Sequence, residues 1–397
     1  MYKRQVQLIP RHLFESFRGA KSREAPNNLK PVGTGPYRFV EFKPGDLVRG
    51  ELNPSYHMHN RPHFDSFELK GGGDAVSAAR TVLQTGEYDF AWNLLVEDEV
   101  LKRLETGGKG RVHFSPGGDT EYIRLAVADP SVEIEGERAH PRSRHPILRD
   151  KAVRQALLLL TDRRAIQQHV YGRGGVATAN ILNNPARFNS TGMSLESSLD
   201  KANALLEAAG WKRGADGIRE KDGRKLRFVY QSSINAVRQK VQQIVKQGCG
   251  KAGIDLELKT VTASVFFGSD PGNPDTMQKF WADIQMYAFT RTPDPGRFMQ
   301  QFVSWEVSSK ANKWLGLNNG RWTNDDYDKA FRAAEVELDP VKRAALFIRM
   351  NDILCTDVHV IPIVYRPKVD AMARNLVAPL SGWDLELSVI HDWYREG

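Results

Sequence analysis

Cysteine is scarce in this chain: Cys249 and Cys355 are its only two, far apart in 397 residues. This number excludes a zinc site built from a cysteine cluster and a scaffold held by several disulfides, while one disulfide stays open. Long hydrophobic runs are also absent, so we expect no transmembrane helix. The first residues, MYKRQVQLIPRHLFESF, lack the apolar stretch of a signal peptide, which by itself points to the cytoplasm.

The charge carries little information about partners. The chain holds 56 Lys and Arg against 48 Asp and Glu, a formal net charge of +8, and 41% of its residues are hydrophobic. These are the proportions of an ordinary globular protein. The densest basic stretch, residues 136–149, has Pro and Ser interleaved and no aromatic residue to stack on bases. We therefore expect no nucleic-acid partner.

Catalytic motifs are missing as well. The chain has no G-x-S-x-G, no H-E-x-x-H and no complete phosphate loop; the run GGKG at 107–110 lacks the Ser or Thr that would follow. His57, His59 and His63 suggest a metal site, but only Asp65 is near enough in sequence to complete a ligand set. We expect a surface loop there, no metal or other cofactor, and no enzymatic activity.

Segments typical of strands and helices alternate along the chain, which predicts an α/β fold. Alternating apolar residues and Gly or Pro turns indicate strands within 29–70. Helical spacing of apolar residues predicts helices over 150–170 and 235–252, and over 201–211 with Asp200 as the cap. Further strands are expected in the segments 111–116, 121–129, 254–261, 280–290 and 358–373, a hairpin within 215–233, and helices over 325–336 and 340–356.

Several segments together resemble the family 5 extracellular solute-binding proteins, which are the dipeptide-, oligopeptide- and nickel-binding components of ABC importers. The residues that carry this resemblance are PVGTGPYRFVEFKPGD, NPSYH, RPHFDSFELK, LQTGEYDFAWNL, HPILRDKAVRQALLLLTDRRAI, ALLEAAGW, KQGCGKAGIDLELK and RAALFIRMNDILCTDVHVIPIVY, in that order. Their ordered succession is more specific than any one of them.

The resemblance implies a periplasmic binding protein type II-like α/β fold with two lobes joined by a hinge. It predicts three regions: the remainder of the first lobe (1–148), the second lobe (149–370) and a return to the first lobe (371–397). In the family a signal peptide and a further segment precede the GTGPY stretch, which here begins at residue 33. We therefore expect part of the first lobe, its inserted domain and the signal peptide to be missing, and the protein to be periplasmic or attached to the cell surface.

The implied function is to capture a peptide or related small solute by hinge closure and deliver it to an ABC permease and its ATPase. A solute-binding module for chemosensing is the alternative. We expect the protein to act as a monomer.

The candidate ligand-binding residues follow a predicted strand. In peptide-binding relatives an Asp pairs with the ligand's α-amino group, and the matching position here is Arg291, which would favour a carboxylate or phosphate instead. Arg291 could equally be an ordinary surface residue. The other candidates, weaker and each open to a packing role, are Tyr287, Phe289, Asp294, Trp92, Asn93 and Tyr122.

Overall fold

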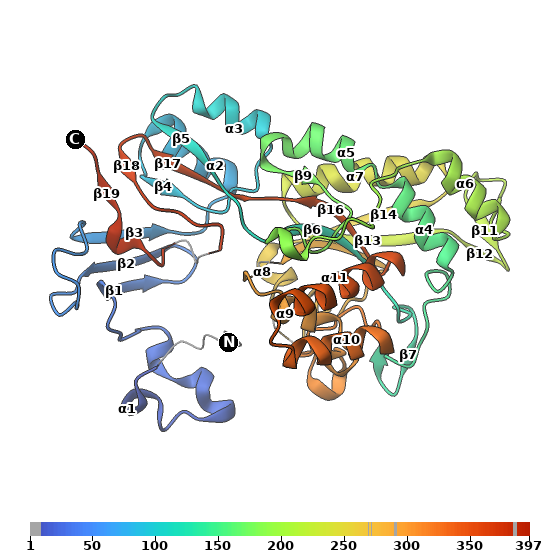
Figure 1. The fold of residues 1–397 in the computed structure, drawn as a ribbon, viewed down its shortest axis with the longest axis horizontal. Coiled ribbons are helices and arrows are strands. Elements are labelled where there is room, and N and C mark those ends of the chain that lie inside the picture. Colours follow the sequence, from blue (N-terminus) through green and yellow to red (C-terminus); the bar gives the residue numbers. More distant parts are fainter. Residues whose placement is uncertain (1–8, 269, 271, 290–291, 384–386) are drawn as a thin grey trace. The chain divides into compact units, whose positions relative to one another are not determined.

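The computed structural model describes residues 9–268, 270, 272–289, 292–383 and 387–397 (Figure 1). The chain forms two compact units. Unit 1 combines the residues up to Leu94 with Val100–Ser115 and Lys368–Gly397, and unit 2 combines Leu95–Glu99 with Pro116–Pro367. The sequence predicted boundaries after residues 148 and 370; the two units change over at 115/116 and 367/368.

Unit 1 contains two small antiparallel sheets, with strand orders β1-β2-β3 and β4-β17-β5. Strand β17 lies between β4 and β5, so the last part of the chain joins two strands from its first third. The elements of this unit are the strands β1 (Tyr37–Lys43), β2 (Leu47–Leu52), β3 (Ser66–Lys70), β4 (Phe90–Ala91), β5 (Gly110–Ser115), β17 (Lys368–Ala373), β18 (Leu376–Val377) and β19 (Tyr394–Arg395), the helices α1 (Arg11–Phe14) and α2 (Ala75–Arg80), and most of α3 (Asp98–Glu105).

The sheet β1-β2-β3 has one apolar and one charged face. Register pairs Val48 with Phe42 and Leu69, and Gly50 with Phe39 and Phe67. Because paired residues point to the same side, and because side chains two apart on β2 share a face, these apolar residues form one surface. Phe42 and Leu69 are 38% and 37% exposed, so this apolar face is only partly covered.

Unit 2 is built on a six-stranded mixed sheet of order β14-β13-β15-β6-β16-β9. β13 pairs in parallel with β14 and β15, whereas β6 pairs antiparallel with β15 and β16. The sheet strands are β6 (Thr120–Leu125), β9 (Val176–Ala177), β13 (Arg227–Ser233), β14 (Asp255–Val261), β15 (Ile284–Phe289) and β16 (Val360–Tyr365), and the short strands outside it are β7 (Glu133–Ile134), β8 (Glu137–Arg138), β10 (Lys212–Arg213), β11 (Arg219–Lys221) and β12 (Arg224–Lys225).

Helices cover both faces of this sheet, so its central strands are buried on both sides. On β6, Ile123 belongs to a hydrophobic core shared with α4 to α7, while its neighbour Tyr122 belongs to a second core shared with α9 to α11. Figure 1 shows the two groups on opposite sides of the strands. The helices are α4 (Lys151–Leu160), α5 (Arg163–Ile166), α6 (Leu199–Ala208), α7 (Ala236–Lys251), α8 (Ala263–Phe266), α9 (Gly296–Met299), α10 (Asp325–Val336) and α11 (Pro340–Thr356).

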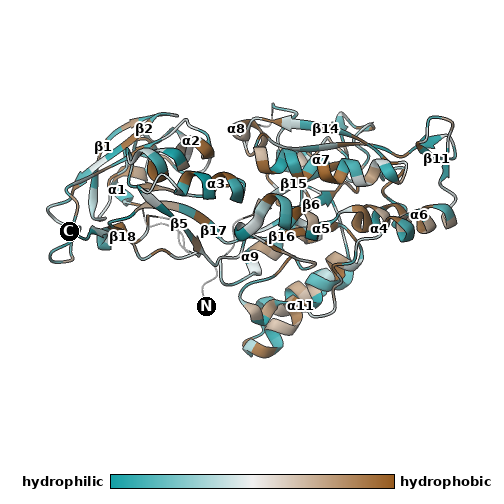
Figure 2. Ribbon diagram, turned by 90° about the horizontal axis from the view of Figure 1, so that it is seen from above, coloured by the Kyte–Doolittle hydropathy of each residue, from teal (hydrophilic) through white to brown (hydrophobic). Residues whose placement is uncertain are grey.

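Most predicted elements of unit 2 are confirmed, including α7, α10 and α11 and the strands β6, β14, β15 and β16. The hairpin is also confirmed: β11 and β12 pair around Asp222 and Gly223, which both have positive φ, and the ribbon around β11 is hydrophilic in Figure 2. One cap was wrong, because the side chain of Ser198, and not that of Asp200, caps α6.

The predicted helix over 150–170 is wrong as a single element. The hydrophobic α4, brown in Figure 2, ends at Leu160. Thr161 then leaves the helical conformation with ψ of 93°, and the Asp162 side chain caps α5 by accepting a hydrogen bond from the Ala165 amide. The apolar periodicity runs through both helices because both cover the same core, which hides the break between them.

Both cysteines are buried and free. Burial raises the pKa of each thiol to about 12. Cys249 lies in the core shared with α4 to α7 and Cys355 in the core shared with α9 to α11, and the two form no disulfide in this structure. Within the described part of the chain, no helix combines the length and apolar character needed to cross a bilayer.

Candidate functional site

The candidate residues fall in both units. Trp92 and Asn93 follow β4 in unit 1, while Tyr122, Tyr287, Phe289 and Asp294 lie in unit 2. Trp92 is 55% exposed, and Asn93 has a positive φ, with its amide donating to Asp370 Oδ1 over 3.1 Å. Arg291, the main candidate from the sequence, lies outside the described residues.

The aromatic candidates of unit 2 are brought together by strand pairing. Tyr122 on β6 pairs directly with Tyr287 on β15, and their ring centroids are 5.0 Å apart. Both side chains are buried, and the Tyr122 hydroxyl lies 3.3 Å from Gln301 Oε1. Phe289, at the end of β15, packs 6.1 Å from Phe298. The rings thus form one wall at the end of β15.

Asp294 organises the loop after this wall. Its carboxylate accepts from the Gly296 amide over 2.7 Å and pairs with Arg343 over 2.7 Å. Burial acts to raise the pKa of Asp294, but these contacts hold that pKa below its usual value. Because its carboxylate is already bound to Arg343 and to the Gly296 amide, Asp294 positions the loop in this structure.

A small cavity opens on this aromatic wall. It measures about 40 Å³ and is lined by Met277, Gln278, Tyr287, Phe289, Arg297, Gln301, Leu317 and Asn319. One water needs roughly 10–15 Å³, so the cavity can hold the end of a side chain or a few waters. We call these eight residues the β15 pocket.

A larger hollow of about 520 Å³ lies along α11 and the start of α4. None of the candidate residues lines it. The ligand-binding residues predicted from the sequence therefore do not line the larger of these two hollows.

Sequence reasoning missed a buried arginine behind the β15 pocket. Arg124 on β6 has no exposed surface, and its guanidinium donates to Asn318 Oδ1 (3.0 Å) and to the Gln301 carbonyl (3.1 Å). It also approaches the Tyr287 hydroxyl (3.4 Å) and His359 Nε2 (3.3 Å). The available signal was a charged residue inside the apolar run YIRLAV.

The histidine beside Arg124 is neutral. Burial, followed by the nearby charges of Arg124 and Arg154, holds the pKa of His359 well below its usual value. The hydrogen-bond partners of Arg124 in the described part of the chain are all uncharged, and its guanidinium carbon also lies 4.7 Å from the centre of the Phe302 ring. Burial, together with Arg124, likewise lowers the pKa of the nearby Arg321 to about 10.

A second missed feature is a buried ion network at the other end of β6. The Glu121 carboxylate has no exposed surface and lies 2.9 Å from Arg238 and 3.4 Å from Arg366. Burial alone would raise the pKa of Glu121, but the two guanidinium groups hold that pKa below its usual value. All three charges lie inside unit 2.

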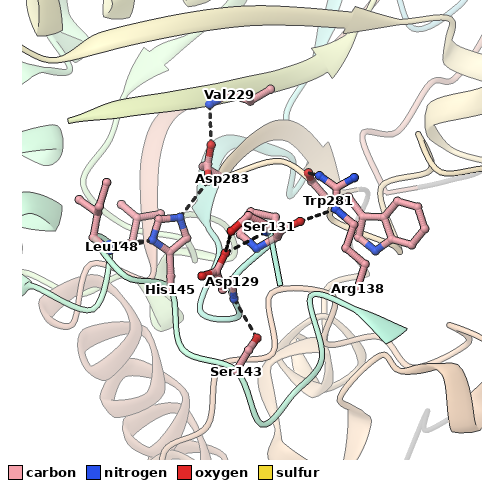
Figure 3. A network of polar contacts seen from close by, with 11 residues as sticks. Asp129, Ser131, Arg138, Ser143, His145, Leu148, Val229, Trp281 and Asp283 are labelled. Atoms are coloured by element: carbon pink, nitrogen blue, oxygen red, sulfur yellow. Dashed lines mark hydrogen bonds and ion pairs between the residues drawn. The ribbon is translucent and has the colours of Figure 1, made fainter. Parts of the chain in front are cut away.

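The basic stretch 136–149 belongs to a polar network within unit 2 (Figure 3). His145 Nδ1 accepts from the amides of Ile147 and Leu148, so its Nε2 carries the proton and donates to Asp283 Oδ1 over 2.9 Å. Asp283 in turn accepts from the Val229 amide on β13. These bonds attach the loop to the sheet, so the polar side chain of His145 has a structural role.

The described residues contain no group of three or more His, Cys, Asp or Glu side chains that could hold a metal ion. In the region of His57, rings pack on rings: Tyr56 lies 4.6 Å from His57 and 6.0 Å from His391.

Comparison with known proteins identifies a family and several relatives that the chain resembles. Residues 4–310 match the sequence model described as bacterial extracellular solute-binding proteins, family 5 middle. The chain is 27% identical over 336 residues to the oligopeptide-binding protein AppA of Bacillus subtilis, covering 83% of this chain and 55% of that protein. It thus spans a little over half the length of the curated relatives it matches.

Two solved structures show the fold. AppA from Bacillus subtilis, in complex with a nonapeptide, superposes with a TM-score of 0.80 at 23% identity, over 98% of this chain and 72% of that one. NikZ from Campylobacter jejuni, in complex with Ni(L-His), gives a TM-score of 0.81 at 20% identity over the same shares. The predicted α/β fold of the type II periplasmic binding proteins is confirmed.

Proposed function

The chain belongs to family 5 of the bacterial extracellular solute-binding proteins, and on this basis we propose that it is the substrate-binding component of an ABC importer. Its ligand is a peptide or a related small solute, captured by hinge closure and delivered to a membrane permease with its ATPase. It acts as a monomer in the periplasm or at the cell surface and catalyses no reaction.

The observation that supports this proposal most directly is the aromatic wall with its small cavity at the end of β15. Ligand sites in proteins combine apolar walls with a few placed polar groups. We assign ligand contacts to Tyr287 and Phe289 on this wall, and to Tyr122 and Asp294 as groups that position it. Trp92 and Asn93 of unit 1 and the residue Arg291 complete the proposed set.

Capture by closure follows from differential affinity. A ligand that binds the closed state better than the open state shifts the population toward the closed state by that difference in free energy. Such capture needs no covalent chemistry, so the proposed site requires neither a nucleophile nor a general base.

Isothermal titration of the 397-residue chain with pools of short peptides tests the proposal. We expect binding by at least one pool, together with a decrease in the radius of gyration in small-angle scattering. The Arg291→Ala variant should weaken binding, whereas Arg149→Ala, which removes the positive charge of an exposed side chain, should not. Failure of every pool to bind at millimolar concentration would overturn the proposal.

A further inference from the structure

Four of the eight residues that line the β15 pocket come from two segments that one lysine joins. Met277 and Gln278 belong to the segment before β15, whereas Leu317 and Asn319 belong to the loop before α10. Lys279 directly follows Gln278 and is only 4% exposed. The distance between the loop and this segment sets the width of the pocket between them, so whatever joins the two controls that width.

The side chain of Lys279 contacts two indole rings. Its Nζ lies 3.8 Å from the centre of the Trp314 ring and 4.5 Å from the centre of the Trp281 ring. A cation is attracted to the face of an indole, and the attraction grows as both groups are shielded from water. Burial lowers the pKa of Lys279, while the carboxylates of Asp270 and Glu137 act to raise it. The contact attaches Trp314, and with it the loop before α10, to the segment before β15.

Trp281 is itself held in place from another part of unit 2. The guanidinium carbon of Arg138 lies 5.3 Å from the centre of its ring, and the two residues lie side by side in Figure 3. Trp281 therefore supports the lysine from the sheet side, whereas Trp314 is the ring that the lysine attaches.

The conformation of the loop depends on contacts that hold it. Lys313 and Trp314 both have φ of 54°, a conformation that is strained for residues with side chains and persists only where the surroundings maintain it. The Trp314 side chain makes no hydrogen bond in the described part of the chain, because its buried Nε1 has no acceptor there. Its polar contact is therefore the one between its ring and Lys279.

The base of the loop is closed, so a contact on the loop acts on the pocket. The backbones of Val307 and Asn318 form a bridge, and the Asn318 amide donates to the Glu306 carbonyl over 2.7 Å. A methyl group on Gly316 would lie 2.5 Å from the same carbonyl oxygen. Leu317 thus lies between the tryptophan contact and a tightly packed base.

A second path leads from Lys279 to the pocket through its backbone. The Lys279 carbonyl accepts from Arg321 Nη2 over 2.9 Å, and Arg321 Nη1 donates to the Asn319 carbonyl over 2.9 Å. The Asn319 side chain donates to the Met277 carbonyl over 2.9 Å and lies 3.2 Å from the Tyr287 hydroxyl. Because these polar groups already have each other as partners, the wall they form can sort entering groups by size.

From these contacts we propose that Lys279 is a positioning residue for ligand binding: through Trp314 it fixes the loop that carries Leu317 and Asn319, and so sets how large a side chain the β15 pocket accepts. Lys279 does not itself line the pocket. The argument rests on the proposed function. The inferred substrate class is peptides with a small side chain at the position that reaches this pocket, because a cavity of about 40 Å³ holds the end of a side chain and no indole.

Calorimetry on the full chain with matched peptides tests this role. Alanine-based pentapeptides with free termini carry Val or Trp at one position, and that position is moved along the peptide. At one position the dissociation constant should be about 5-fold or more lower for the Val member, because an indole overfills the cavity. Lys279→Met keeps an unbranched stem that packs well on aromatic rings but removes the charge, and should bring the ratio close to one. Lys279→Arg keeps a cation and should restore part of the ratio.

Three further variants identify the contact that matters. Trp314→Leu should reduce the ratio as Lys279→Met does, and the double variant should reduce it no further than either single change, because both remove the same contact. Lys246→Met removes the charge of an exposed lysine on α7 and should preserve the ratio. Amide hydrogen exchange over residues 308–319 should become faster in Lys279→Met and Trp314→Leu, and stay unchanged in Lys246→Met.

Thermal melts report whether each variant folds, and Trp314→Leu gives the same comparison if Lys279→Met does not fold. A purely structural role would lower the melting temperature and leave the ratio as it is. A ratio that Lys279→Met and Trp314→Leu leave intact, or a ratio near one in the unmodified chain, overturns the positioning role and leaves the proposed function standing. Binding of no peptide in the set overturns the proposed function itself.

Discussion

The carboxylate of Glu121 is buried and lies between the guanidinium groups of Arg238 and Arg366. Removing one partner of a buried ion pair leaves uncompensated charge, which typically costs about 3–5 kcal/mol. We expect Glu121→Gln to lower the free energy of unfolding of unit 2 by that amount, as measured by urea denaturation. Glu196→Gln is the matched control, because Glu196 pairs with the exposed Lys201 and should cost less than about 1 kcal/mol. Equal losses would contradict the network's role.

His359 gives the protein a pH dependence of known sign. Its pKa is well below the usual value in the folded chain, whereas the unfolded chain takes up a proton near pH 6.5. The unfolded state therefore binds more protons below that pH, and stability is full above pH 6.5 and falls as the pH is lowered, by up to about 1.4 kcal/mol per pH unit.

Urea titrations between pH 7.5 and 5.5 measure this slope. His359→Gln keeps an acceptor for Arg124 and should make the slope shallower, while His169→Gln, at an exposed position, should leave it as it is. The same slope in His359→Gln and the unmodified chain would refute the assignment.

Residue by residue, sequence reasoning found the aromatic candidates but not their surroundings. Tyr287 and Phe289 could be predicted because they end an apolar strand ahead of a Pro-rich loop. Arg124 and His359 are far apart in sequence, and the pairing of β6 with β16 brings them together, while Asn318 comes from the loop before α10. No local pattern encodes such a cluster.

At the scale of elements, α4 and α7 approach so closely that a glycine is required between them. A methyl group on Gly248 would lie 2.6 Å from the Leu160 carbonyl oxygen, whereas one on Gly250 meets nothing within 4 Å. We expect Gly248→Ala to cost about 1–3 kcal/mol through overpacking. Gly250→Ala, on the same helix, should gain up to about 1 kcal/mol. Thermal melts of the two variants give the comparison, and a stabilising Gly248→Ala would disprove the close approach.

Elements were predictable where caps and periodicity agreed. Asn235 and Asp339 mark the starts of α7 and α11 by capping them. The break at Thr161 was hidden because α4 and α5 contribute to one core, so that their apolar residues continue one pattern.

At the scale of the whole molecule, the partly covered apolar face of β1-β2-β3 should be detectable in solution. Exposed apolar patches bind hydrophobic dyes and promote association. Anilinonaphthalene sulfonate fluorescence should fall in the double variant Phe42→Thr/Leu69→Thr. Arg38→Thr/Glu51→Thr, which alters the charged pair Arg38–Glu51 on the opposite face, should leave the signal unchanged. Dye binding equal in all three proteins would contradict an accessible apolar face.

The place of β17 between β4 and β5 sets an order in time. A ribosome makes β4 and β5 early, but the strand that joins them appears only with residues 368–397. In unit 2 the strand β16, which lies between β6 and β9, ends at Tyr365, directly before β17 begins at Lys368. Both main sheets are therefore completed only when residues 360–373 have been made, and until then the strand edges that β16 and β17 will cover are open to chaperones and to neighbouring chains.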